Sequence, residues 1–212
     1  MIYQLDRILE DVRICIDENV SSDALAGIGD VDTLSQDEII RSKVVEAVER
    51  VHTTAPAYLI ESGHNFGDEV YWREMESGWV LLPKDFMRLV VFEMDDWSEA
   101  VYQAIGPDSV EYKKQRSRFK GIRGTAERPV CALAIRPEGR VLEFYSCKST
   151  DAKVSRAVYV PYPKIDEDGG IDISERCYRA VVYVAAALTL TAEGEEERSQ
   201  SLMARAQALL EV

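Results

Sequence analysis

The apolar residues of this chain follow a helical period near both ends and a strand pattern between them. Near the start, they recur at spacings of three and four, which predicts a helix over residues 2–18 with one apolar face. A second helix is predicted to begin at the capping-box sequence SQDE, residues 35–38, and to end before Pro56, whose ring disfavours helix in the preceding residue. Two further helices are predicted near the other end, the first from Ile173 to Gly194 and the second directly after it.

Between these helical parts, residues 65–163 are rich in β-branched and aromatic residues, which turn residues divide into short runs. Ser77 and Gly78 separate two such runs, which predicts a hairpin, and the sequence PEG at residues 137–139 predicts another. The predicted strands cover residues 70–75, 79–82, 86–94, 129–135, 141–145 and 157–160. We therefore expect a small, mainly antiparallel β unit in the middle of the chain.

The order of two helices, a β unit and two helices predicts an α+β fold. We expect the four helices, from residues 1–64 and 164–212, to pack as an antiparallel four-helix bundle. The β unit, residues 65–163, is expected to be inserted in this bundle and to project from one of its ends. An apolar content of 46% in 212 residues is sufficient for a substantial core.

The chain is acidic, with 25 Lys plus Arg against 38 Asp plus Glu and a net charge of −13. This charge disfavours general affinity for nucleic acids and anionic membranes. No apolar run approaches the roughly 20 residues of a membrane-spanning helix, and the first residues lack the basic-then-apolar pattern of a signal peptide. We therefore expect a protein that is made in, and works from, a cytoplasm. The four cysteines are far apart in sequence and are interpreted as small buried apolar residues.

One short run reverses the charge of the chain: KKQRSRFKGIRG, residues 113–124, contains six cations and no acid. The rest of the chain carries 19 Lys plus Arg against 38 Asp plus Glu. The run can be a solvated loop, a contact with DNA, or a docking loop for an acidic surface, and we favour docking. We expect Gly121 and Gly124 to let it bend. The candidate docking residues are Lys113, Lys114, Arg116, Arg118, Lys120 and Arg123.

Few residues suggest catalysis, a cofactor or a metal. The acidic turn at residues 166–172 lacks the glycine and the bidentate glutamate that a calcium-binding EF-hand loop requires. The sequence GIG at residues 27–29 lacks the third glycine of a dinucleotide-binding motif. An enzyme site composed of scattered residues such as His64, Asp95 and Asp96 is the weakest alternative. We expect no enzymatic activity, no cofactor and no metal.

Four stretches of the sequence resemble the head–tail adaptor, or connector-ring, proteins of tailed bacteriophages, in particular those of phages of Bacteroidetes-type hosts, including crAss-like phages. These stretches are residues 35–48, 82–92, 123–133 and 178–188. Together with the order of the elements, the resemblance covers nearly the whole chain. None of the stretches is a catalytic motif, so the resemblance rests on the overall arrangement.

The resemblance implies a structural role in the virion, at the portal vertex or neck of the particle, after assembly in the host bacterial cytoplasm. Proteins of this family form homo-oligomeric rings, usually of twelve copies, which bridge the portal protein and the tail or the next ring. Double-stranded DNA passes through the ring without sequence-specific binding, and no cofactor or enzymatic activity is needed. In a ring of identical subunits, the basic run of each copy can reach the acidic surface of its neighbour.

A different function class stays open beside the ring. A nucleic-acid-binding module could grip phosphates with the basic run, with Phe119 stacking on a base. The acidic remainder of the chain opposes the approach of nucleic acid, and only one aromatic residue lies among the six cations.

Overall fold

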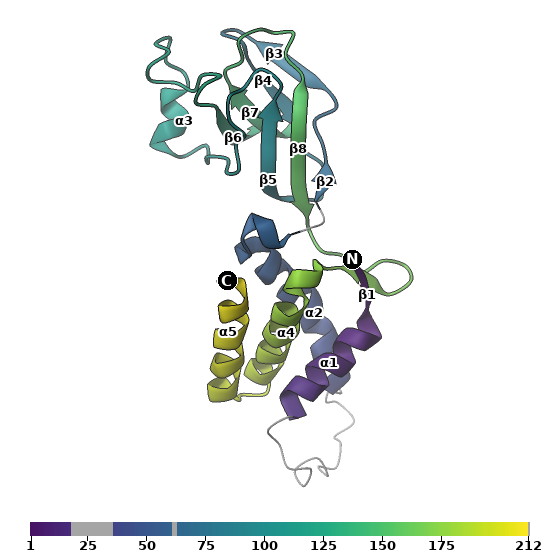
Figure 1. The fold of residues 1–212 in the computed structure, drawn as a ribbon. Coiled ribbons are helices and arrows are strands. Elements are labelled where there is room, and N and C mark those ends of the chain that lie inside the picture. The colour runs from purple at the N-terminus through teal and green to yellow at the C-terminus, as the bar shows by residue number, and fades with distance from the viewer. Residues whose placement is uncertain (18–35, 61–62, 212) are drawn as a thin grey trace. The chain divides into compact units, whose positions relative to one another are not determined.

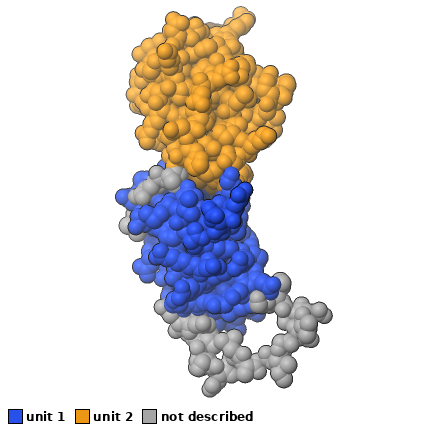
Figure 2. Space-filling model, turned by 90° about the vertical axis from the view of Figure 1, so that its right-hand side faces the viewer, with its two compact units in different colours: residues 1–62, 163–212 blue, residues 63–162 orange. Residues whose placement is uncertain are grey.

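The computed structural model describes residues 1–17, 36–60 and 63–211, and the chain divides into two compact units (Figures 1 and 2). Unit 1 consists of Met1–Ser62 and Pro163–Val212, and unit 2 of Gly63–Tyr162. Unit 2 is thus inserted between two halves of unit 1; the expected boundaries were 64/65 and 163/164. The glycine pair at residues 27–29 and Ser35 of the expected capping box lie outside the described residues.

Unit 1 contains the helices of both ends of the chain and a two-stranded sheet in which β1 and β9 are antiparallel. The predicted helix over residues 2–18 begins as a strand, because Ile2, Tyr3 and Gln4 pair with Asp172, Ile171 and Gly170. This pairing overrides the local helical period. The described elements of unit 1 are β1 (Ile2–Gln4), α1 (Leu5–Asp17), α2 (Gln36–Thr54), η1 (Ala57–Leu59), β9 (Gly170–Asp172), η2 (Glu175–Cys177), α4 (Tyr178–Ala192) and α5 (Glu196–Leu210).

Helix α4 is the centre of unit 1, and α1, α2 and α5 each pack against it (Figure 1). Ten of its fifteen residues are buried, from Ala180 to Leu190, because the helix is apolar around most of its circumference. Helices α2 and α5 leave an open groove of about 1020 Å³ between them, so the four helices do not enclose a shared core. The prediction of a four-helix bundle is therefore wrong, whereas the α+β class agrees with the structure. No helix within the described ranges is long and apolar enough to cross a membrane.

Unit 2 consists of two antiparallel sheets, with strand orders β2-β8-β5 and β3-β4-β7-β6. The predicted strand over residues 86–94 is confirmed as β5, and the two predicted hairpins are present as the pairs β3–β4 and β6–β7. The first hairpin turns at residues 74–76, where Met75 and Glu76 have positive φ, and not at Ser77 and Gly78, which are the first residues of β4. The elements are β2 (His64–Asn65), β3 (Val70–Arg73), β4 (Ser77–Leu81), β5 (Phe86–Met94), α3 (Val110–Lys114), β6 (Val130–Arg136), β7 (Gly139–Tyr145) and β8 (Val154–Pro161).

One aromatic core joins the two sheets of unit 2. The ring of Phe92 in β5 lies 5.9 Å from the ring of Phe144 in β7, so the contact crosses from one sheet to the other. Trp97 packs edge-on against both rings, and its indole nitrogen donates to the backbone oxygen of Ser146. All three tryptophans of the chain lie in unit 2, so their fluorescence reports on the folding of this unit.

Candidate docking site

The basic segment, residues 113–124, begins in the last turn of α3 and continues through turns toward β6. Helix α3 is capped at its N-terminus by Ser109, whose hydroxyl accepts a hydrogen bond from the backbone nitrogen of Tyr112. After the helix, the backbone nitrogen of Ile122 donates to the carbonyl oxygen of Phe119 at 3.0 Å, which closes a turn. The segment is therefore folded along most of its length.

Five of the six predicted docking cations are exposed: Lys113, Lys114, Arg116, Arg118 and Lys120. Among the residues that the structure describes, only Lys114 of these five makes an ion pair, with Glu111 at 3.6 Å. Two apolar side chains stand beside them in solvent, since Phe119 is 74% and Ile122 52% exposed. The segment thus presents positive charge, most of it unpaired, together with apolar surface, and it includes the arginine and aromatic side chains that are enriched in protein interfaces.

Arg123, the sixth predicted docking residue, is buried, with only 8% of its surface exposed. Its Nε and Nη1 atoms have no hydrogen-bond partner within the described part of the chain. The periodic sequence signal does not distinguish this arginine from its neighbours, because turns carry no regular inward face. Of the six predicted docking residues, the other five are therefore the exposed ones.

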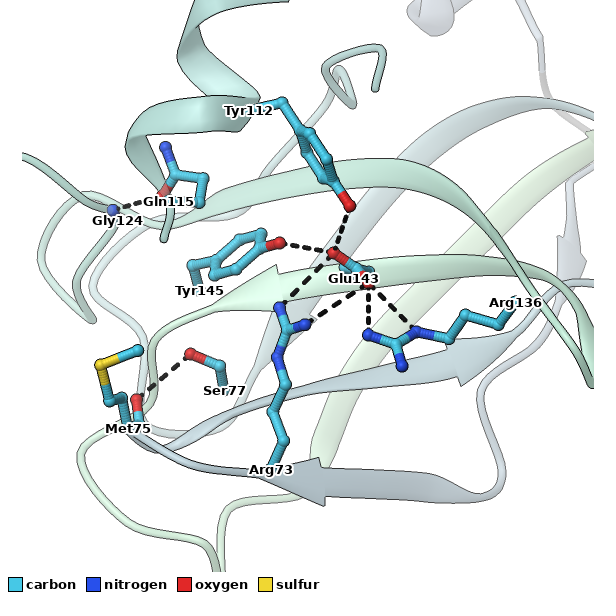
Figure 3. A network of polar contacts seen from close by, with 9 residues as sticks. All are labelled: Arg73, Met75, Ser77, Tyr112, Gln115, Gly124, Arg136, Glu143 and Tyr145. Carbon is cyan, nitrogen blue, oxygen red and sulfur yellow. Dashed lines mark hydrogen bonds and ion pairs between the residues drawn. The ribbon is translucent and has the colours of Figure 1, made fainter. Parts of the chain in front are cut away.

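Gln115 anchors the basic segment at both of its ends. Its buried side chain donates through Nε2 to the backbone oxygen of Glu111 at 3.0 Å. Its Oε1 accepts from the backbone nitrogen of Gly124 at 2.7 Å (Figure 3). The carbonyl oxygen of Gly124 in turn accepts from the hydroxyl of Ser146 at 3.2 Å. These bonds hold the turns between residues 115 and 124 closed against the β unit.

Gly124 is required for close approach rather than for bending, which differs from the sequence-based expectation. A Cβ atom at this position would lie 2.6 Å from the carbonyl oxygen of Tyr145 and 3.1 Å from the Cβ atom of Val130. Gly121, by contrast, has open space around its Cα atom. The two glycines of the segment therefore have different roles.

Replacing Gly124 with alanine should destabilise unit 2 by about 1–3 kcal/mol, because the added methyl group must push the backbone of β7 away. Gly121→Ala is the matched control and should change stability by less than about 0.5 kcal/mol. Chemical denaturation followed by tryptophan fluorescence measures both. Equal effects of the two substitutions would show that Gly124 does not act through its close approach to Tyr145.

Glu143 connects α3 to the four-stranded sheet through a buried polar network (Figure 3). Its side chain is only 3% exposed. The carboxylate accepts hydrogen bonds from the hydroxyls of Tyr145 (2.5 Å) and Tyr112 (3.1 Å) and from Nη2 of Arg136 (2.6 Å). Nη2 of Arg73 lies 3.5 Å from the same group. Because Tyr112 belongs to α3, this network fixes the start of the basic segment on the sheet.

The network keeps Glu143 charged despite its burial. Burial raises the pKa of this carboxyl. Hydrogen bonds from Tyr145 and Arg136 and the charge of Arg73 lower the pKa by more than burial raises it, so the pKa lies below its ordinary value. Burial, followed by the hydrogen bond to Glu143, raises the pKa of Tyr145, and burial and the charge of Glu143 raise that of Tyr112. Both tyrosines therefore stay protonated and donate to the carboxylate.

The net charge of the chain lies entirely in unit 1. Unit 1 contains 10 Lys plus Arg against 23 Asp plus Glu, which gives −13, whereas unit 2 contains 15 of each and is neutral. Within unit 2, the basic segment supplies six of the 15 cations. One unit is thus strongly acidic and the other carries a concentrated patch of positive charge.

The residues of the alternative enzyme site are not brought together. His64 lies in β2 opposite Tyr159 of β8, whereas Asp95 and Asp96 follow the end of β5, which pairs with the beginning of β8. Along β8 these places are roughly 16 Å apart. Both carboxylates accept backbone hydrogen bonds from the connection between β7 and β8, so they hold that connection in place.

The acidic turn at residues 166–172 is stabilised by its own backbone. The Oδ1 atom of Asp166 accepts from the backbone nitrogens of Asp168 (3.1 Å) and Gly170 (2.5 Å). Within the described residues, no group of three or more His, Cys, Asp or Glu side chains is placed to hold a metal ion.

The basic segment is therefore largely exposed and hydrogen-bonded to the β unit, and it presents positive charge together with apolar side chains. It offers the chemistry of a docking surface for an acidic partner. Comparison of the chain with models of known protein families and with curated proteins gives no match.

Proposed function

We propose that this protein is a structural virion protein that forms a ring between the capsid portal and the tail of a bacteriophage. The observation that carries the proposal is the separation of charge between the two units. Unit 1 has a net charge of −13, and unit 2 presents five exposed cations on one anchored segment. The acidic unit 1 of one copy is thus complementary in charge to the basic segment of another copy.

A contact of this kind joins two different surfaces of the same protein. When two copies join by such a heterologous contact, one copy keeps a free acidic unit and the other keeps a free basic segment. Further copies can therefore add at both ends until the ring closes. The resemblance of the four sequence stretches to connector-ring proteins supports a closed ring, usually of twelve copies, in the neck of the particle. Its other partners are then the portal protein and the tail or next ring, and assembly takes place in the bacterial cytoplasm.

The acidic composition also suits a conduit for double-stranded DNA. A surface of like charge repels the phosphate backbone, so that DNA moves past the ring without adhering to it. The role requires no bound cofactor and no catalytic group.

Charge reversal in the basic segment tests this function. The variant Arg116→Glu, Arg118→Glu, Lys120→Glu should weaken self-association by roughly 100-fold, since three attractive contacts with an acidic neighbour become repulsive. The folded monomer should persist, because all three side chains are exposed. Light scattering of the purified protein and electron microscopy of rings on portal particles measure the effect.

A matched control changes the same total charge elsewhere in unit 2. Lys148, Lys153 and Arg156 are exposed and lie outside the basic segment. Their reversal to glutamate should leave ring formation nearly unchanged. Normal ring yield in the first variant would contradict docking by the segment. Tight DNA binding with a steep salt dependence, lost only in the first variant, would instead support the nucleic-acid-binding alternative.

A further inference from the structure

The groove between α2 and α5 in unit 1 has an apolar floor and a volume of about 1020 Å³. Volumes of this size accommodate several side chains. The floor is formed by side chains from α2, α4 and α5, because α2 and α5 pack on α4 without covering it at this point. These are Val51, Val184, Met203, Ala206 and Leu210.

The rim of the groove is acidic. It carries the carboxylates of Glu46, Glu49 and Glu211 against a single guanidinium, that of Arg50. Arg50 pairs with Glu46 at 2.7 Å, and Glu211 accepts a hydrogen bond from Gln207 at 2.8 Å. The exposed carboxylate of Glu49 makes no ion pair with any described residue. An occupant of this groove should therefore be apolar in part and positively charged at its margins.

The basic segment of unit 2 has both properties. Phe119 and Ile122 are its exposed apolar side chains, and the backbone bond between these two residues closes a turn that keeps them near one another. Arg118 and Lys120 flank Phe119 and are exposed. The exposed apolar and positively charged side chains of the basic segment thus match the apolar floor and the acidic rim of the groove in unit 1.

We infer that the basic segment of a second copy docks in the α2–α5 groove, with Phe119 and Ile122 on the apolar floor and Arg118 and Lys120 against the acidic rim. This inference rests on the ring proposed above and assigns the two surfaces that join neighbouring subunits. Each copy contributes one segment and one groove, so the contact propagates head to tail.

A mixing experiment with two variants tests this assignment. The segment variant, Phe119→Asp with Ile122→Asp, retains an intact groove. The groove variant, Met203→Arg with Leu210→Arg, retains an intact segment but places positive charge on the floor. Each variant alone should be monomeric and should form no ring on portal particles. An equimolar mixture should form a heterodimer of about twice 23.9 kDa that does not grow further, because only one segment–groove pair is functional.

The controls separate docking from misfolding. All four substituted side chains are at least partly exposed, and helix circular dichroism with tryptophan fluorescence checks that each variant is folded. Ala204→Arg with Ala208→Arg adds the same two charges to exposed positions of α5 that do not line the groove. This control should assemble like the wild type.

The outcomes distinguish this inference from the function on which it rests. If the wild type assembles but the mixed variants remain monomers, or if either variant assembles alone, the subunits join through other surfaces and the assignment fails while the ring stands. A wild-type protein that stays monomeric alone and with portal particles contradicts the ring itself, and the docking with it.

Discussion

The substitution Glu143→Gln is expected to lower the free energy of unfolding of unit 2 by about 2–4 kcal/mol. Removing one partner of a buried ion pair leaves the other charges without compensation, which typically costs about 3–5 kcal/mol. We expect a smaller loss of stability than this because the side chains of Arg73 and Arg136 keep 30% and 25% of their surface in solvent. Denaturation followed by tryptophan fluorescence measures the change, since Trp72, Trp79 and Trp97 all belong to unit 2.

The pH dependence of this effect follows from the lowered pKa of Glu143. A carboxyl with a lower pKa in the folded state stabilises the fold above its ordinary pKa of 4.5, and this contribution is lost as the pH falls through the folded-state value. The difference between wild type and Glu143→Gln should therefore be constant near neutral pH and shrink below pH 4.5. Glu138→Gln, at the exposed turn between β6 and β7, is the control and should have little effect at any pH. A difference that grows on acidification would contradict the role of the ionised carboxylate.

The substitution Phe144→Ala should destabilise unit 2 by about 3–5 kcal/mol, the usual cost of removing a fully buried phenylalanine ring. Phe144 has no exposed surface, and its ring contacts those of Phe92, Trp72 and Trp97. The loss should move the fluorescence transition more than the helix signal at 222 nm, because the long helices belong to unit 1.

Phe119→Ala makes the same chemical change at a position that is 74% exposed. It should leave the stability of the monomer within about 0.5 kcal/mol of wild type. A loss of stability at residue 119 comparable to that at residue 144 would show that the basic segment is packed in the core.

Local patterns were sufficient to predict both hairpins and every described strand of unit 2 except the two-residue β2, and most of the helices of unit 1. They did not predict the short helix α3. They were not sufficient for β1, since its backbone partners, residues 170–172, are far away in the sequence. The bundle was predicted from the order of the elements, two helices on either side of a β unit. Helix α4 is apolar around most of its circumference, and a helix of that kind takes a central position. The number and length of helices do not determine such an arrangement.

The candidate site was predictable in its charge but not in its support. Counting cations locates the basic segment, whereas the burial of Arg123 and the close approach at Gly124 depend on tertiary contacts. Glu143 was missed altogether. It interrupts an apolar strand sequence between Leu142 and Phe144, and a charge at such a position is a signal for a buried ion pair.

The pairing of β2 with β8 has a consequence for how unit 1 folds. His64 lies opposite Tyr159, so the chain enters and leaves folded unit 2 at neighbouring positions. The two halves of unit 1 are separated in the sequence by a loop of about 100 residues. Once unit 2 is folded, this loop has the effective length of only a few residues. By the logarithmic dependence of loop-closure entropy on length, this reduces the entropic cost of joining α1 and α2 to α4 by about 2–3 kcal/mol. Folding of the inserted unit thus acts as an internal tether for the helices on either side of it in the sequence.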